Sequence, residues 1–352
     1  SPAHLVNDFF AFPGTDSLTL LNGTYVATSD LNGDGFADLI FGGGPGGATV
    51  AKYVAKDGGV DVTLVEPASR FTTCFHSNLY LGGFRTLESL SHGYDGLRRL
   101  GVKVVHDYAT AVDPAKKSVT TRAGRTFVYD RLVMSPGIDI MSDTLPGLTT
   151  PGAQDKVLHA WKAGADTVAL RKQLEEMRDG GVFVLSIPRA PYRCPPGPYE
   201  RASLIAAYLK RAKPRSKVLV LDANPDVTSK GPLFKKAWAD LYKGIVEYRP
   251  NSELQEVDAR SNTIKLLGGD VKADVLNVVP PQKSGRIAEV AGVITANNRW
   301  CEIDWLTYES VKQKNIHVLG DATLSAPLMP KSGHMANQHA KVCAAAVISL
   351  LH

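Results

Sequence analysis

The feature that most constrains the fold of this chain is the glycine spacing Gly42-x-Gly44-x-x-Gly47. An apolar stretch, FADLIFG, leads into these glycines; the helically patterned GATVAKYVAKDG and the apolar VDVTLVEP follow them. Strand, glycine turn, helix and strand in this order predict a βαβ unit. In such a unit the first glycine permits a tight turn, the second lets the backbone approach a ligand, and the third lets the helix pack closely.

The residues around the turn indicate which ligand it would bind. The first N–H groups of the helix and its positive dipole end favour a phosphate group. Glu66 ends the second predicted strand, about 20 residues after the turn, where an acidic side chain binds the ribose of a dinucleotide. A flexible surface turn would explain the glycines but not the strand, helix and terminal acid that flank them. We therefore predict a dinucleotide site at Gly42, Gly44, Gly47 and Glu66.

A second βαβ pattern lies in the middle of the chain. Its predicted elements are a helix at 165–177, a strand at 181–187, a helix at 198–212 and a strand at 217–224. The loop after the first of these strands, PRAPYRCPPGPYE, contains five prolines and one glycine, and proline lacks the N–H group that would bind a phosphate. We therefore expect no pyridine nucleotide at this loop, and we interpret Asp222 as a strand-end cap rather than a ribose ligand.

The order of the elements predicts an α/β fold with two Rossmann-like, dinucleotide-binding domains, the first of them discontinuous. Apolar residues at helical spacing predict a further helix over 86–100 and a final helix over 334–351. The expected divisions are a β-rich extension at 1–35, a first domain at 36–150 and 290–352, and a second domain at 151–289.

Composition narrows the classes of function. The hydrophobic fraction of 44%, the charged fraction of 21% and the net charge of +5 are those of a globular protein, without a basic run that would bind nucleic acid. No apolar run reaches the roughly 18 residues of a membrane-spanning helix. The four cysteines, Cys74, Cys194, Cys301 and Cys343, form no CxxC or CxxCH motif, so we expect neither a zinc site nor a resident c-type haem.

From Gly42 to the C-terminus the chain resembles the flavoprotein subunit of sulfide dehydrogenase (flavocytochrome c), a relative of sulfide:quinone oxidoreductases and glutathione-reductase-type flavoproteins. The matching stretches are GGATVAKYV, FTTCFHSN, LESLSHGYDGLRRLGVKVVHD, YDRLVMSPGI, YRCPPGPYERAS, KADVLNVVPPQKSGRIAEVAG, IHVLGDA and MPKSGHMANQHAKV. The resemblance implies FAD, two dinucleotide-type domains, sulfide oxidation, electron transfer to a separate c-type cytochrome subunit, and a periplasmic location.

The resemblance also assigns cofactor-binding residues by position. Ser135-Pro136-Gly137 matches a second FAD-contacting turn, and Asp321 matches the residue that holds the ribityl chain. The expected FAD ligands are Gly42, Gly44, Gly47, Glu66, Ser135, Gly137, Asp321, Lys331, Ser332 and Gly333. Cys74 falls where the family attaches its flavin through a thioether, although a lone cysteine is more often a buried apolar residue.

Cys194 corresponds to one member of the redox disulfide of the family. In that chemistry sulfide attacks the disulfide, which leaves a persulfide on one cysteine and frees the other as a thiolate that can attack the flavin. Glu200 matches a carboxylate near the flavin and is a candidate proton acceptor, although an acid in the first turn of a helix is also favoured by the helix dipole. The resemblance therefore makes Cys194 and Glu200 the candidate catalytic residues.

The sequence departs from the family at both ends. Family members continue past the last cofactor helix into a segment with the second redox cysteine, whereas this sequence ends at His352, so we expect impaired activity. We expect Cys343, among alanines, and Cys301 to be structural rather than replacements for that cysteine.

Residues 1–41 resemble an FG-GAP (VCBS-type) repeat. Its calcium loop would use the oxygen-bearing side chains of Asp30, Asn32, Asp34 and Asp38, although a turn without an ion has the same composition. We expect the strand over 36–41 to belong to the flavin fold, with any calcium ion at its entrance.

Two other functions stay open at this point. The chain could be a different flavin-dependent oxidoreductase that uses quinone or NADH, although the proline-rich loop argues against NADH. It could also be a calcium-binding adhesion or scaffold protein of the FG-GAP type, although one repeat cannot close a propeller and none follows.

Overall fold

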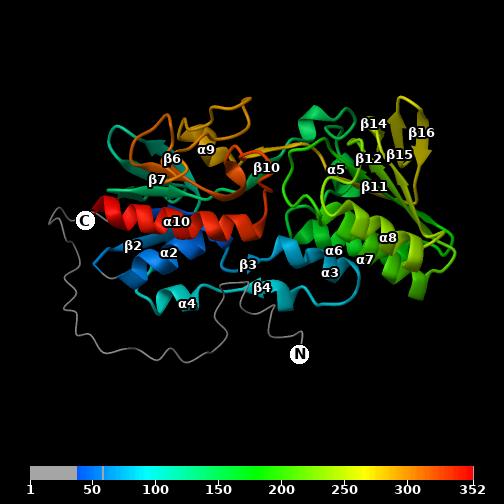
Figure 1. Ribbon diagram of the computed structural model, residues 1–352, viewed down its shortest axis with the longest axis horizontal. Helices are drawn as coiled ribbons and strands as arrows, with labels where there is room; N and C mark the ends of the chain where they lie inside the picture. The colour runs from blue at the N-terminus through cyan, green and yellow to red at the C-terminus, as the bar shows by residue number, and fades with distance from the viewer. Residues whose placement is uncertain (1–37, 58, 352) are drawn as a thin grey trace. The chain divides into compact units, whose positions relative to one another are not determined.

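The computed structural model describes residues 38–57 and 59–351, which form two compact units (Figure 1). Of the described residues, the first unit contains those up to Phe71, Gly93–Asp139 and those from Lys283 onward. The second contains Thr72–His92 and Ile140–Gln282. The structure therefore has the α/β architecture and the discontinuous first unit that the sequence predicts.

A parallel five-stranded sheet forms the core of the first unit, in the order β19-β9-β1-β2-β5. Every residue of the four strands other than β5 is buried, as expected for a parallel sheet covered on both faces. The strands are β1 (Asp38–Phe41), β2 (Val62–Val65), β5 (Lys103–Val105), β9 (Leu132–Met134) and β19 (Ile316–Val318).

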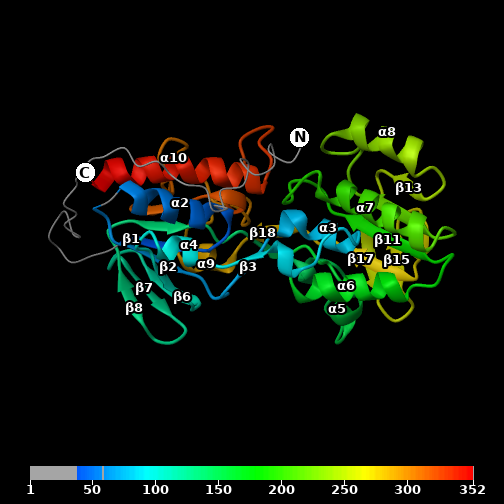
Figure 2. The same cartoon turned by 90° about the horizontal axis from the view of Figure 1, so that it is seen from below.

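Two helices, α2 (Pro45–Asp57) and α10 (Gly333–Leu351), pack side by side on one face of this sheet (Figure 1). The amide of Asn337 on α10 donates a hydrogen bond to the Thr49 hydroxyl on α2 at 2.9 Å. A small antiparallel sheet lies on the other side (Figure 2). Its strands are β6 (Ala109–Asp113), β7 (Ser118–Thr121) and β8 (Thr126–Val128). The short helices of the first unit are α4 (Asp95–Arg98), α9 (Arg286–Val290) and the 3-10 helix η4 (Gly320–Ala322).

The second unit is also built on a parallel sheet, in the order β13-β12-β11-β17. These strands are β11 (Val182–Ile187), β12 (Lys217–Asp222), β13 (Val246–Arg249) and β17 (Val275–Val278). An antiparallel sheet of β14 (Leu254–Asp258), β15 (Thr263–Leu266) and β16 (Gly269–Lys272) adjoins it. The helices are α3 (Ser77–Leu81), α5 (Ala153–Lys156), α6 (Ala165–Glu176), α7 (Gly197–Ala212) and α8 (Gly231–Leu241), with 3-10 turns η1 (Cys74–His76), η2 (Glu88–Leu90) and η3 (Ser142–Thr144).

Short strands occur where the chain passes from one unit's segments to the other's. β3 (Phe71–Thr72) pairs with β4 (Ser91–His92), and β10 (Ile138–Ile140) pairs with β18 (Gln282–Ser284). The sequence assigned 72–92 to the first domain, whereas the structure groups it with the second unit. The reason is that α3 packs against α6 and α7 (Figure 1).

The predicted helices at 165–177, 198–212 and 334–351 are confirmed as α6, α7 and α10. The predicted helix over 86–100 is wrong, because the structure has η2, β4 and α4 in its place. Leu90 and Tyr94 are buried as the spacing suggested, but Ser91–His92 pairs with β3 and Gly93 follows it. Glycine disfavours a continuous helix, and the strand pairing takes up the intervening backbone.

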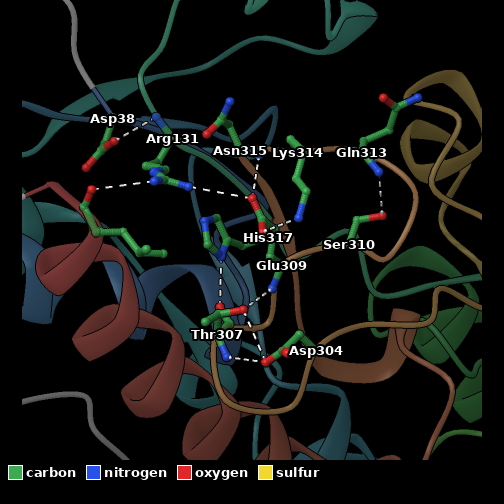
Figure 3. Close-up of polar contacts among 11 residues, drawn as sticks. Asp38, Arg131, Asp304, Thr307, Glu309, Ser310, Gln313, Lys314, Asn315 and His317 are labelled. Atoms are coloured by element: carbon green, nitrogen blue, oxygen red, sulfur yellow. Dashed lines mark hydrogen bonds and ion pairs between the residues drawn. The ribbon is translucent and has the colours of Figure 1, made fainter.

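A polar network holds the amino ends of the first unit's strands (Figure 3). The Arg131 N–H donates to the buried carboxylate of Asp38 at 3.1 Å, and the Arg131 guanidinium lies 3.6 Å from Glu309. Glu309 also accepts the backbone N–H of Asn315 at 2.7 Å, just before β19. These contacts fix the end of the sheet opposite the glycine turn.

None of the helices among the described residues is long and apolar enough to cross a membrane.

Candidate functional site

The glycine turn lies between β1 and α2, as predicted. Gly42 has a φ of +89°, and a side chain there would collide with the Ser135 carbonyl oxygen. A side chain at Gly47 would collide with the Gly42 carbonyl oxygen. At Gly44 the nearest atom to a Cβ would be a ring carbon of Phe71 at 3.6 Å, so this glycine has an open side. Gly42 and Gly47 are thus required for packing, whereas Gly44 leaves room for a ligand.

Glu66 follows β2 and helps to hold this turn. Its carboxylate accepts the backbone N–H of Gly43 at 2.7 Å and that of Ala68 at 2.9 Å. The buried Tyr94 donates its hydroxyl to the Gly43 carbonyl oxygen at 3.2 Å, and burial raises the pKa of this phenol. A carboxylate oxygen accepts more than one hydrogen bond, so Glu66 can hold the turn and still accept a ribose hydroxyl.

The carboxyl ends of the other strands lie next to the turn. Ser135 follows β9, and a Cβ at Gly46 would collide with its hydroxyl and with Leu319 after β19. Gly320, with a φ of +74°, begins η4, which contains Asp321. Gly137, with a φ of +65°, accepts the N–H of Gly285 at 3.1 Å. The structure therefore brings the predicted residues that follow β1, β2, β9 and β19 to one edge of the sheet, where α/β folds bind dinucleotides.

Lys331 is buried just before α10. Its ammonium donates to the carbonyl oxygens of Asp321 and Thr323 and lies 3.7 Å from the centre of the Trp300 ring. Burial lowers the Lys331 pKa to about 8. Burial and the nearby Lys331 charge lower the pKa of His339 to about 4, and its Nδ1 accepts the Gly320 N–H at 3.3 Å. Lys331 and His339 thus both fix the turn that carries Asp321.

Ser332 and Gly333 form the start of α10. The Ser332 hydroxyl accepts the N–H of Met335 at 3.2 Å, as an N-cap residue does. Together with the glycine turn, this helix end gives the sheet edge a second set of positive backbone dipoles. The open side of Gly44, the fixed Glu66 and the Asp321 turn fit a dinucleotide cofactor such as FAD.

Cys194 lies in the proline-rich loop between β11 and α7. Its φ of +58° is unusual for a residue with a side chain, and Pro195 follows it directly. A Cβ at Gly197 would lie 2.9 Å from the Cys194 sulfur and 3.1 Å from a ring carbon of Trp161. The half-buried sulfur is therefore close to the Trp161 ring. Backbone strain of this kind often occurs at functional sites.

Glu200 lies in the first turn of α7, in the same unit as Cys194. Its carboxylate accepts the side-chain N–H of Asn78 at 2.8 Å. Burial raises the pKa of Glu200, although the Asn78 hydrogen bond and the Arg201 charge oppose this shift. A half-buried carboxyl whose pKa is raised accepts a proton more readily than a free carboxylate does.

Two neighbours of Glu200, Arg201 and Asn78, were not predicted from the sequence. Arg201 is buried, and its Nε donates to the Asn78 side-chain oxygen at 2.9 Å. The guanidinium also donates to the side-chain oxygen of Asn277 at 2.8 Å and to the carbonyl oxygens of His159 at 3.0 Å and Ala160 at 2.7 Å. Both residues occur in matching stretches, FTTCFHSN and YRCPPGPYERAS, which was the only available signal.

Cys74 begins η1 and is half-buried in the second unit. Ser77 donates its hydroxyl to the Cys74 carbonyl oxygen at 2.6 Å and begins the helix that carries Asn78. The predicted structural roles of Cys343 and Cys301 agree with their burial. Burial raises the pKa of both thiols, that of Cys301 to about 11.

Asp222 is buried at the end of β12, where the sequence suggested a cap. It accepts the hydroxyls of Tyr199 at 2.7 Å and Tyr248 at 3.0 Å through one carboxylate oxygen. The other oxygen accepts the backbone and side-chain N–H groups of Asn224 at 2.9 and 2.7 Å. These internal bonds agree with its interpretation as a structural residue.

The calcium prediction falls mainly outside the described residues, which exclude Asp30, Asn32 and Asp34 and with them the FG-GAP-like segment. Asp38 begins β1 with its side chain buried, and burial raises its pKa to about 7. Over residues 38–57 and 59–351 there is no cluster of three or more acidic, histidine or cysteine side chains that could hold a metal. The strand is part of the first unit's sheet, as predicted.

The chain matches two protein families over segments that overlap at residues 167–184. Residues 38–184 match the family described as pyridine nucleotide-disulphide oxidoreductase. Residues 167–280 match the central region of the sulfide dehydrogenase [flavocytochrome c] flavoprotein chain. The first match contains the glycine turn and Cys74, and the second contains Cys194, Glu200 and Arg201.

Individual relatives point the same way. The mitochondrial sulfide:quinone oxidoreductase of Dictyostelium discoideum is 25% identical over 81% of this chain, which spans 65% of that relative. The flavocytochrome c sulfide dehydrogenase flavoprotein chain of Chlorobaculum thiosulfatiphilum is 54% identical over 41 residues, 11% of this chain and 85% of the relative.

Among solved structures, the sulfide:quinone oxidoreductase of Aquifex aeolicus shares the fold, with a TM-score of 0.76 and 20% identity over 90% of this chain and 77% of that one. The two family matches, these relatives and the shared fold agree with the geometry of the two units. The chain belongs to the flavoproteins of the sulfide dehydrogenase and sulfide:quinone oxidoreductase type.

Proposed function

We propose that this chain is an FAD-dependent oxidoreductase that oxidises sulfide at Cys194 and delivers the electrons to a c-type cytochrome subunit. The observation that carries the proposal is the second unit's loop. A cysteine in a strained turn, whose sulfur lies next to Gly197 as the Trp161 ring does, is followed six residues later by the half-buried Glu200. Sulfide oxidation requires a sulfur that bonds to sulfide, a proton acceptor and a two-electron acceptor, which FAD would be.

The first unit would hold FAD through the residues at its sheet edge. The open side of Gly44 and the start of α2 suit the pyrophosphate, Glu66 the adenosine ribose, and Asp321 the ribityl chain. Ser135, Gly137, Lys331, Ser332 and Gly333 complete the proposed set. When bound, FAD supplies the capacity to accept an electron pair and to pass electrons on singly. We also propose a thioether between Cys74 and the flavin.

The electron acceptor distinguishes two candidate functions. The Chlorobaculum thiosulfatiphilum relative is named as a flavocytochrome c chain, which supports a cytochrome partner. With that partner we also propose a periplasmic location. The Dictyostelium discoideum and Aquifex aeolicus proteins are named as sulfide:quinone oxidoreductases, which makes quinone the second candidate. The proline-rich loop and the internal hydrogen bonds of Asp222 argue against NADH or NADPH as a substrate.

The test is sulfide-dependent reduction of each acceptor by the FAD-loaded protein. With sulfide as the electron donor, we expect cytochrome c to be reduced faster than a water-soluble quinone. With NADH in place of sulfide, we expect neither acceptor to be reduced through the flavin. Faster quinone reduction would favour the second candidate, and bound FAD with no sulfide-dependent reduction of either acceptor would contradict the proposed function. Acid precipitation tests Cys74 separately, because a covalent flavin stays in the pellet and the Cys74→Ser variant releases it.

A further inference from the structure

The buried positive charge of Arg201 interacts electrostatically with Cys194, and its hydrogen-bond partners include no carboxylate. Arg201 is 1% exposed. The four acceptors of its hydrogen bonds are uncharged: two side-chain amides, of Asn78 and Asn277, and two backbone carbonyls. Burying a cation is costly, and neutral acceptors offset this only in part. The site therefore favours an additional anion nearby.

The hydrogen-bond donors of Arg201 and Trp161 also outnumber their acceptors. A guanidinium has five N–H groups, and the Arg201 bonds use four of them. The Trp161 indole N–H is buried and has no acceptor in the part of the chain that the structure describes. The Arg201 guanidinium carbon lies 4.8 Å from the centre of the Trp161 ring, and this ring approaches the Cys194 sulfur beside Gly197. Two N–H groups are thus left for an acceptor.

Asn78 connects the buried cation to Glu200. Its side-chain oxygen accepts from Arg201 at 2.9 Å, while its side-chain nitrogen donates to Glu200 at 2.8 Å and to the Gly197 carbonyl oxygen at 3.1 Å. These bonds also fix the orientation of the amide, because each end faces a partner of the opposite kind. A change of charge at Arg201 is therefore transmitted to Glu200 through one side chain.

The other charged groups around Arg201 leave a positive excess. His159 lies 3.1 Å from Asp166, and burial lowers the pKa of this histidine although Asp166 opposes the shift. Arg193 donates to the Trp161 carbonyl oxygen, and Lys162 also acts on His159. Among the charged groups that act on Arg201, Arg193 is a cation and Glu200 an anion, so the two guanidinium charges outnumber the one carboxylate.

We propose that Arg201 is a positioning residue that stabilises an anionic sulfur on Cys194 and, through Asn78, orients Glu200 toward the same reaction. The anion is the Cys194 thiolate, which the thiol forms by losing its proton. That this thiolate takes part in sulfide oxidation rests on the proposed function, whereas the presence of the thiolate does not. Arg201 acts through its charge as well as through its hydrogen bonds, which is the property that distinguishes it from a purely structural arginine.

The test is the rate at which iodoacetamide alkylates Cys194 in the reduced full chain, followed by peptide mass spectrometry as a function of pH. Removing a cation close to a thiolate shifts its titration upward by about one pH unit or more, so we expect Arg201→Met to slow alkylation about tenfold near neutral pH. Arg201→Lys keeps the charge, and its rate should stay within about threefold of the wild type.

Asn78→Asp tests the charge in a variant that keeps the side-chain shape. A carboxylate next to the Arg201 Nε would neutralise the cation, so alkylation of Cys194 should again slow about tenfold near neutral pH. If Arg201→Met does not fold, this variant decides. Arg171→Met is the matched control, because Arg171 stacks on Tyr208 at 4.2 Å and donates to the Leu81 carbonyl oxygen. It should leave the alkylation profile unchanged.

Wild-type alkylation kinetics in Arg201→Met or in Asn78→Asp, or an equal loss in Arg171→Met, would overturn the proposal. Alkylation requires neither sulfide nor bound FAD. A protein that fails to oxidise sulfide but shows the expected alkylation profile would therefore contradict the proposed function and support the role of Arg201.

Discussion

The loops after β1 and β11 occupy the same place in two similar βαβ units but differ in chemistry. The first contains Gly42, Gly44 and Gly47, which bring backbone close to backbone and leave one open side. The second contains five prolines and positions Cys194, with Glu200 and Arg201 at the start of the following helix. The comparison teaches that one fold can present either backbone N–H groups for a phosphate or side chains for sulfur chemistry.

Breaking the glycine turn should have the largest effect. We expect Gly47→Val to destabilise the protein by about 3 kcal/mol or more and to abolish FAD binding, because its Cβ would collide with the Gly42 carbonyl oxygen. Thermal unfolding and flavin content of the purified variant measure both effects. Unchanged flavin content would contradict the role of the turn.

Gly44→Ala sharpens the same comparison, since its Cβ has space next to Phe71. The fold should keep its stability within about 1 kcal/mol, because alanine suits the start of a helix. FAD affinity, measured by fluorescence titration, should fall about tenfold or more, because the methyl group occupies the approach of the pyrophosphate. Wild-type affinity would show that the ligand does not approach this glycine.

In the second unit the residue that matches a ribose-binding acid should affect stability instead of binding. Asp222→Ala would remove the carboxylate that accepts the buried Tyr199 hydroxyl and the half-buried Tyr248 hydroxyl, so we expect a loss of about 3 kcal/mol in the free energy of unfolding. Denaturant titration measures this loss. The control Asp226→Asn removes an exposed ion pair with Lys235 and should cost less than about 1 kcal/mol. A different result would contradict the structural role of Asp222: the wild type reduces its flavin with NADH, and Asp222→Ala loses this activity while keeping its stability.

The buried carboxyl of Asp38, at the amino end of β1, should make the free energy of unfolding depend on pH. Burial raises the Asp38 pKa to about 7, above its value of 3.8 in the unfolded chain. The native state then holds the proton more tightly, so this stabilising contribution is complete at low pH and is lost as the pH rises to 7. Asp38→Asn should therefore gain about 2 kcal/mol over the wild type between pH 5 and 8.

Denaturant titrations of Asp38→Asn and the wild type at the two pH values measure this difference. The control Asp61→Asn removes only a surface ion pair with Lys103 and should show a difference below about 1 kcal/mol at both pH values. A constant difference for Asp38→Asn would show that its carboxyl is ionised throughout.

The sequence predicted the parts of the molecule that depend on local pattern. The glycine turn, Glu66 and the helices α6, α7 and α10 follow from spacing and flanking residues. The helix over 86–100 did not form because strand pairing at Ser91–His92 interrupts it. Tertiary pairing of this kind is not encoded in local periodicity.

The Arg201 cluster could not be predicted for a similar reason. Arg201 and Asn78 are 123 residues apart, and Glu200 and Asn78 are 122 residues apart. A single sequence carries no signal for such pairs, and a buried arginine is unusual enough that composition argues against it. The assignment of 72–92 to the second unit depends on the same contacts, so it could not be predicted either.

The central claim, that the proline-rich loop carries the sulfur chemistry while the glycine turn holds the cofactor, is tested most directly by anaerobic titration of the FAD-loaded protein with sulfide. The absorbance of the oxidised flavin should disappear in the wild type. Cys194→Ser should bind FAD as well as the wild type does, and its flavin should stay oxidised on the same timescale. Equal reduction of the flavin in wild type and Cys194→Ser would contradict the account.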